Sequence, residues 1–121
     1  MSALHLVNAH IVCPVAGERH GDLLIVDGVI SDGLAPDDAV RVNCGGKLIL
    51  PGIVDVGVAK IDRAAFRAGG ITRVALMPDQ SPVLDEPGIV QRSALIGRPD
   101  LWIHPIAAAT RGLKGNDLAE M

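Results

Sequence analysis

Aromatic side chains are almost absent from this chain. Phe66 and Trp102 are the only aromatics among 121 residues, and tyrosine does not occur. The formal charge is -3 at pH 7, and the pI is near 5.7. Surfaces that bind nucleic acid usually combine a basic stripe with aromatic side chains on which bases stack. The composition therefore predicts no nucleic-acid partner.

Long apolar runs are missing as well. No run approaches the roughly 18 apolar residues that a membrane-spanning helix needs. The opening residues MSALHLVNAH also lack the basic-then-apolar order of a signal peptide. We therefore expect no membrane association and a cytoplasmic location.

Closely spaced cysteines do not occur either. Cys13 and Cys44 have no CxxC spacing, which argues against a zinc knuckle and against a thioredoxin-type redox pair. In a reducing compartment, free cysteine behaves as a small apolar side chain. Both residues are expected to be buried free thiols.

The first part of the chain has the pattern of short strands joined by tight turns. The first strand is rich in Leu, Val and Ile and is predicted to be interrupted at Asn8-Ala9. Asp27-Gly28 lies between two apolar runs, which is a strong hairpin signal. Further short strands are predicted at 39–44 and 47–50. Residues 1–52 are thus predicted to form a small β-sheet or half-sandwich.

The pattern changes after Pro51-Gly52, a turn signal between two apolar segments. Strands are then predicted at 53–58, 71–77 and 101–108, and helices at 61–68, 86–96 and 112–121. This alternation indicates parallel βα units. The predicted fold class is α/β, with the N-terminal sheet followed over 53–121 by an incomplete (βα) TIM-type barrel, because a complete barrel has eight strands and about 250 residues.

Four segments, in this order, carry a resemblance to a known family. They are 48–55 (LILPGIVD), 68–74 (AGGITRV), 77–85 (MPDQSPVLD) and 109–115 (ATRGLKG). The chain resembles the first part of amidohydrolase superfamily proteins, in particular the dihydroorotase branch. The resemblance implies a TIM-type barrel, a zinc cofactor and hydrolysis of a cyclic amide in pyrimidine biosynthesis.

The chain departs from this family at the end of the first barrel strand. There the family has an Asp-x-His-x-His pattern whose two histidines bind the metal, since side chains at i and i+2 of a strand share a face. Here Asp55 is kept, but the histidine positions are Gly57 and Ala59, and a substrate-binding arginine is replaced by Ile61. The loop that normally separates this strand from its helix is also expected to be missing, because a helix-like segment follows almost at once. We expect no catalytic residue and no metal ligand in this chain, and we favour a structural role for Asp55.

Asp79 is the one candidate substrate-binding residue. It stands where many relatives have a substrate-binding asparagine, and a carboxylate there offers no amide donors and repels an anionic substrate. A loop-capping role for Asp79 or Ser81 is favoured over a substrate contact. Asp85 is predicted to cap the second helix, and His104 to lie near the barrel mouth with backbone partners.

Three functional hypotheses remain open. The resemblance implies a catalytically inactive dihydroorotase-like protein that acts as a structural partner, because inactive relatives associate with aspartate transcarbamoylase. Self-association through the open edge of the incomplete barrel is a further expected interaction. The second hypothesis is a fragment of a metal-dependent cyclic-amide hydrolase, and the third is a small α/β domain without a ligand.

Overall fold

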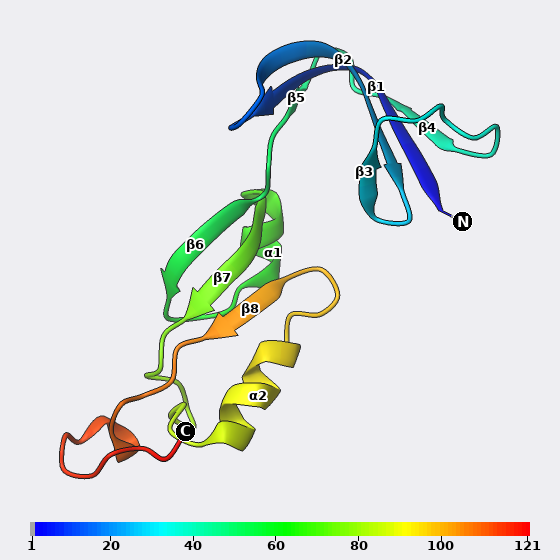
Figure 1. Ribbon diagram of the computed structural model, residues 1–121. Coiled ribbons are helices and arrows are strands. Elements are labelled where there is room, and N and C mark those ends of the chain that lie inside the picture. Colours follow the sequence, from blue (N-terminus) through cyan, green and yellow to red (C-terminus); the bar gives the residue numbers. More distant parts are fainter. Residues whose placement is uncertain (1) are drawn as a thin grey trace. The chain divides into compact units, whose positions relative to one another are not determined.

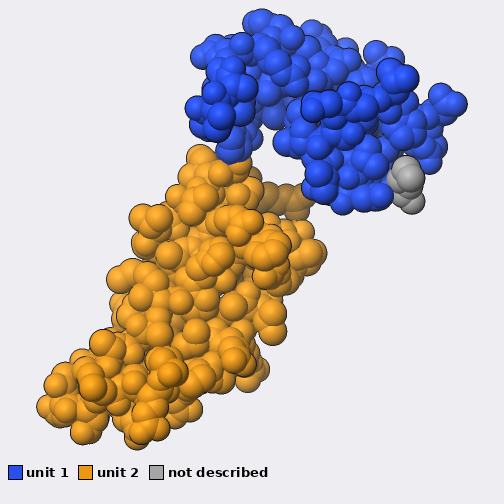
Figure 2. All heavy atoms as spheres, in the orientation of Figure 1, with its two compact units in different colours: residues 1–51 blue, residues 52–121 orange. Residues whose placement is uncertain are grey.

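Pro51 and Gly52 mark the division between two units of the chain. The structure is a computed structural model that describes residues 2–121. Residues up to Pro51 form the first unit, and residues from Gly52 onward form the second (Figure 2). Within the described residues, no helix is long and apolar enough to cross a membrane.

The first unit is a mixed sheet of five strands. The strands are β1 (Ala3–Cys13), β2 (Gly17–Val26), β3 (Val29–Ser31), β4 (Val40–Asn43) and β5 (Leu48–Ile49). Their order is β3-β2-β1-β4, and β5 also pairs with β1 (Figure 1). Strand β1 is antiparallel to β2 but parallel to β4 and β5, so it is the centre of the sheet. This confirms the small N-terminal β-sheet.

The turns of this sheet follow the local sequence. Asp27 and Gly28 both have positive φ, 48° and 81°, as a type I′ hairpin turn between β2 and β3 requires. Asn8 has a φ of 56°, and the register of β1 against β2 shifts between Leu6 and Ala9. The predicted interruption of the first strand is therefore a β-bulge, and asparagine tolerates its left-handed conformation.

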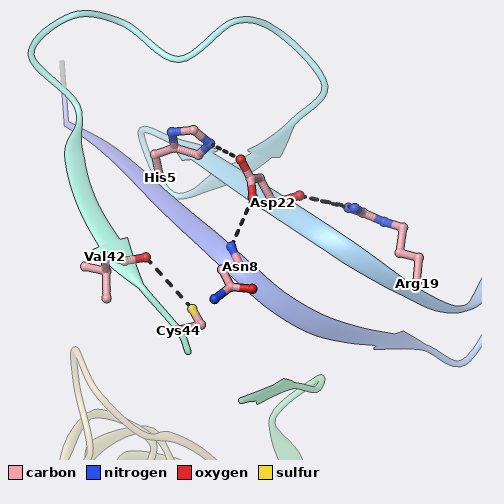
Figure 3. Close-up of polar contacts among 6 residues, drawn as sticks. All are labelled: His5, Asn8, Arg19, Asp22, Val42 and Cys44. Carbon is pink, nitrogen blue, oxygen red and sulfur yellow. Dashed lines mark hydrogen bonds and ion pairs between the residues drawn. The ribbon is translucent and has the colours of Figure 1, made fainter. Parts of the chain in front are cut away.

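Polar side chains surround this bulge (Figure 3). The carboxylate of Asp22 accepts a hydrogen bond of 3.1 Å from the backbone N–H of Asn8, and the Nε2 atom of His5 lies 3.2 Å from the same carboxylate. The Arg19 guanidinium donates to the carbonyl oxygen of Asp22 at 3.2 Å. Because a bulge interrupts the ladder of backbone hydrogen bonds, Asp22 supplies the acceptor that the Asn8 N–H needs.

Both cysteines belong to this unit. Cys13 and Cys44 are free, as predicted, but they are half-buried instead of buried. The Cys44 thiol lies 4.0 Å from the carbonyl oxygen of Val42 (Figure 3). Hydrogen bonds from the backbone N–H groups of Ala16 and Val15 lower the pKa of the Cys13 thiol, because they stabilise its thiolate.

The second unit is a three-stranded parallel sheet with helices. Its elements are β6 (Ile53–Val58), α1 (Arg63–Ala68), β7 (Ile71–Leu76), α2 (Pro87–Leu95), β8 (Trp102–Pro105) and the 3₁₀ helix η1 (Arg111–Leu113). The strand order is β6-β7-β8, and both pairings are parallel (Figure 1). This arrangement confirms the predicted βα units of an incomplete TIM-type barrel.

The core of the second unit lies on one face of this sheet. Its buried residues are Val58, Val74, Leu76, Leu84, Leu101 and Ile103. Phe66 of α1 and Ile89 and Val90 of α2 pack against them, so both helices cover this face. The opposite face is open, and Val54 and Val56 of β6 are 56% and 79% exposed.

The predicted helix over 112–121 is wrong. In its place are the short η1 and an isolated bridge between Thr110 and Leu118. Gly112 and Leu113 both have a φ of 59°, and Gly115 has a φ of 78°. An α-helix requires negative φ at every position, so these residues prevent one from forming.

The predicted cap of the second helix by Asp85 is also wrong. Glu86 is the N-cap residue of α2, and its side chain makes no capping hydrogen bond. The Asp85 carboxylate instead accepts a hydrogen bond of 2.7 Å from the backbone N–H of Gly112. Asp85 therefore holds the segment after β8 in place.

Candidate functional site

The candidate site is the edge of the second sheet where its strands end. In barrels of βα units, the loops that follow the strands build the active site. Two backbone hydrogen bonds continue the ladders into these loops. Met77 N–H donates to the Val58 carbonyl at 2.9 Å, and Ile106 N–H donates to the Leu76 carbonyl at 2.8 Å. The three strand ends are thus fixed beside one another.

Gln80 links two of these strand ends. Its side-chain Nε2 donates to the carbonyl oxygens of Ala59 and Met77, both at 3.0 Å. Within residues 2–121, the side chains of Asp79 and Ser81 accept no hydrogen bond from a backbone N–H group, so the loop-capping role predicted for them is wrong. Asp79 is exposed at this edge. Nothing in the sequence distinguished Gln80, because its partners are backbone carbonyls of two separate loops.

Leu84 anchors the loop that carries Gln80. It is 1% exposed and belongs to the hydrophobic core, although it lies between β7 and α2. Its backbone N–H donates to the Pro78 carbonyl at 3.1 Å, and its carbonyl accepts from Ala108 N–H at 2.8 Å. The loop after β7 is therefore attached both to the core and to the segment after β8.

The positions of the family's metal-binding histidines are at this edge. Gly57 and Ala59 are both exposed there, and neither has a donor atom on its side chain. Asp55 is half-buried, and its Oδ1 accepts a hydrogen bond of 3.1 Å from the backbone N–H of Gly57. In the part of the chain that the structure describes, no three His, Cys, Asp or Glu side chains form a group that could hold a metal ion. The residues present at this edge thus do not fit a zinc ion.

His104 lies away from the backbone partners predicted for it. It is exposed in β8, and its Nε2 is 3.4 Å from Nη1 of Arg73 in β7. The register pairs His104 with Ala75, the residue before the last one of β7. His104 therefore lies on the open face of the sheet, one residue before the end of β8 and close to the strand ends, as expected.

Comparison with known proteins finds that this chain is similar in sequence to dihydroorotases. A dihydroorotase of Pelotomaculum thermopropionicum is 37% identical over 92% of this chain and 30% of its own length. A dihydroorotase of Syntrophotalea carbinolica is 33% identical over 96% of this chain and 32% of its own length. No protein-family model matches the chain.

Solved structures agree on the fold. The L-hydantoinase (dihydropyrimidinase) of Arthrobacter aurescens superposes with a TM-score of 0.70 at 23% identity, over 93% of this chain and 29% of that enzyme. The chain is therefore dihydroorotase-like in sequence and amidohydrolase-like in fold. An amidohydrolase named eaj56179 also superposes, with a TM-score of 0.57 at 18% identity.

This dihydroorotase-like chain spans about 30% of the length of these relatives, and it corresponds to their N-terminal part. The segment of the Pelotomaculum enzyme that matches this chain is longer than the matched part of the chain itself. The match to the Pelotomaculum enzyme runs over 129 positions, whereas 92% of 121 residues is about 111. About 18 positions of the relative thus have no counterpart in this chain.

Proposed function

We propose that this dihydroorotase-like chain lacks hydrolase activity and serves as a structural partner of another protein. The observation that carries the proposal is the identity of the two residues at the end of β6, Gly57 and Ala59. Metal-dependent hydrolysis of an amide uses a metal ion to generate hydroxide and to polarise the carbonyl group. A zinc ion needs imidazole, thiolate or carboxylate ligands, which these two residues cannot supply.

The short connection after β6 supports the same proposal. Only residues 59–62 separate β6 from α1, and α1 itself has six residues. The corresponding connection from β7 to α2 is longer, over 77–86. In barrels of this kind the loop after a strand contributes to the active site. Its shortening would remove binding surface together with the ligands.

Asp79 stays the candidate substrate-contacting residue. It is exposed, and within residues 2–121 it takes part in no ion pair. Its carboxylate would repel an anionic substrate such as dihydroorotate. An Asp79→Asn variant restores the amide that the family resemblance implies, and it is expected to weaken this repulsion without producing turnover.

The activity is tested on the purified chain with two measurements. Metal analysis is expected to give far less than one zinc per chain, and a dihydroorotate hydrolysis assay is expected to show no turnover. The Pelotomaculum dihydroorotase, assayed in parallel with added zinc, is the positive control. Stoichiometric zinc together with turnover by this chain would overturn the proposal.

A double variant separates the absence of the two histidines from the shortness of the connection after β6. Gly57→His with Ala59→His restores two imidazoles at positions i and i+2, but zinc sites in enzymes have at least three protein ligands. We expect weak zinc binding and no hydrolysis. Turnover by this variant would mean that the histidines alone were missing.

The partner is tested by light scattering coupled to size-exclusion chromatography. By analogy with inactive relatives, the proposed partner is aspartate transcarbamoylase, and a co-eluting complex is expected when the two proteins are mixed. The chain alone tests self-association, since β8 is an edge strand of the second sheet. A monomer at all concentrations that does not co-elute with the enzyme would contradict both parts of the proposal.

A further inference from the structure

The open face of the second sheet carries a group of basic and aromatic side chains. The register pairs Arg73 of β7 directly with Trp102 of β8. His104 follows two residues after Trp102 and therefore lies on the same face. Arg98 reaches this face from the connection between α2 and β8. These four residues are called the Trp102 cluster below.

Two guanidinium groups contact one indole ring. The Cζ atom of Arg98 is 3.2 Å from the centroid of the Trp102 ring, and that of Arg73 is 4.8 Å from it. Arg73 also approaches His104, with 3.4 Å between Nη1 and Nε2. A guanidinium that contacts an aromatic ring through its face keeps the N–H groups along its edge free for hydrogen bonds. The ring therefore orients two sets of donors.

No carboxylate of the described residues neutralises these two cations. The ion pairs of the second unit join Arg63 to Asp100 at 3.1 Å and Arg111 to Glu120 at 3.7 Å. Asp100 is close to Arg98 in the sequence, but its carboxylate is bound by Arg63. Two positive groups held on the same ring repel each other, and an anion bound to either of them reduces that repulsion.

We propose that the Trp102 cluster binds a small oxyanion, a carboxylate or a phosphate. Arginine donors match both groups geometrically, because each presents two oxygens to the planar fork of a guanidinium. Trp102 is 40% exposed, so that a ligand can reach the cluster from solvent. His104 Nε2 accepts from the Arg73 guanidinium, which has only donors, so the His104 ring nitrogen left for a ligand is Nδ1. Trp102 is the first residue of β8 and Arg73 the third of β7, so this pair lies away from the loops at the strand ends.

The chain offers a direct readout of this site. Trp102 is its only tryptophan, so intrinsic fluorescence reports on the cluster alone. The protein is titrated with inorganic phosphate and, separately, with succinate, at constant ionic strength maintained with sodium chloride. A saturable change in emission is expected with at least one of the two anions. Saturation by phosphate alone identifies a phosphate site, and saturation by both identifies a general oxyanion site.

Three variants make the test specific. Arg98→Gln and Arg73→Gln are each expected to weaken binding about tenfold, because each removes a charged pair of donors. Arg92→Gln is the matched control, since Arg92 is an exposed arginine of α2 that makes no contact with Trp102. Circular dichroism checks that each variant is folded, and isothermal calorimetry with Trp102→Phe measures binding without relying on the tryptophan signal.

The result that would overturn the proposal is equally specific. Emission that changes linearly with either anion, or in the same way with sodium chloride alone, would mean that no site exists. Equal weakening by Arg92→Gln and Arg98→Gln would mean that only the general charge of the protein matters. None of these measurements involves zinc or hydrolysis, so the outcome is independent of the proposed function.

Discussion

Leu84 provides the sharpest test of how the second unit is held together. It lies in the loop between β7 and α2, yet it is 1% exposed and is one of the two largest fully buried side chains. Replacing a buried leucine by alanine removes its apolar contacts and leaves a cavity, which costs about 2–5 kcal/mol. Leu95 of α2 is 66% exposed. The same substitution there loses little burial, and alanine is the better helix former, so we expect a change below about 0.5 kcal/mol.

Urea unfolding measured by Trp102 fluorescence gives the two values. Trp102 lies in the second unit and is the only tryptophan, so the signal follows the unfolding of that unit. Unfolding free energies of small proteins fall by about 1 kcal/mol or more per molar urea. A loss near 3 kcal/mol for Leu84→Ala thus lowers the midpoint by about 1–3 M, while Leu95→Ala leaves it almost unchanged. Equal midpoints for the two variants would refute the packing described for this loop.

Further predictions concern single contacts. Gly97→Ala is expected to destabilise the second unit by about 1–3 kcal/mol, since an added Cβ would lie 2.5 Å from the Leu101 carbonyl oxygen. Gly88→Ala, in α2 with no atom within 4 Å of the added Cβ, is expected to be neutral or stabilising by up to about 1 kcal/mol, and the same urea titration compares their signs. Gln80→Leu removes two hydrogen bonds and should cost about 1–3 kcal/mol, with Ser81→Ala as the near-neutral control. In a Cys44→Ser variant, alkylation of Cys13 by iodoacetamide should accelerate with rising pH around a midpoint below the ordinary pKa of a thiol. A midpoint at or above that ordinary pKa would contradict the backbone hydrogen bonds to its sulfur.

Local chemistry made part of the fold predictable. Asp27-Gly28 specifies its hairpin without help from the rest of the chain, because few residues tolerate positive φ at both central positions. The parallel order β6-β7-β8 follows from the alternation of strand and helix patterns, since sequential parallel strands need a crossover helix. The loss of two histidines at Gly57 and Ala59 could likewise be stated from the sequence, because it depends only on which residues stand there.

Contacts between distant segments were not predictable in this way. Leu118 and Met121 have helical spacing, but they are 78% and 57% exposed, so burial of an apolar face does not favour a helix there. Asp85 is an ordinary capping residue by type, and only the folded chain brings the Gly112 N–H to it. The pairing of Arg73 with Trp102 depends on the register of β7 against β8, which no local pattern determines.

The changes at the end of β6 are best understood together. If the histidines alone had been lost, a long loop with polar groups would still follow the strand. Instead, the connection is four residues long, over 59–62, and the Ala59 carbonyl is bonded to Gln80 from the next loop. Gln80 also binds the Met77 carbonyl, so that both of these carbonyls have a protein partner. Two imidazoles restored at positions 57 and 59 would still lack the third protein ligand that zinc sites in enzymes have, which is the physical reason to expect that these reversions do not restore hydrolysis.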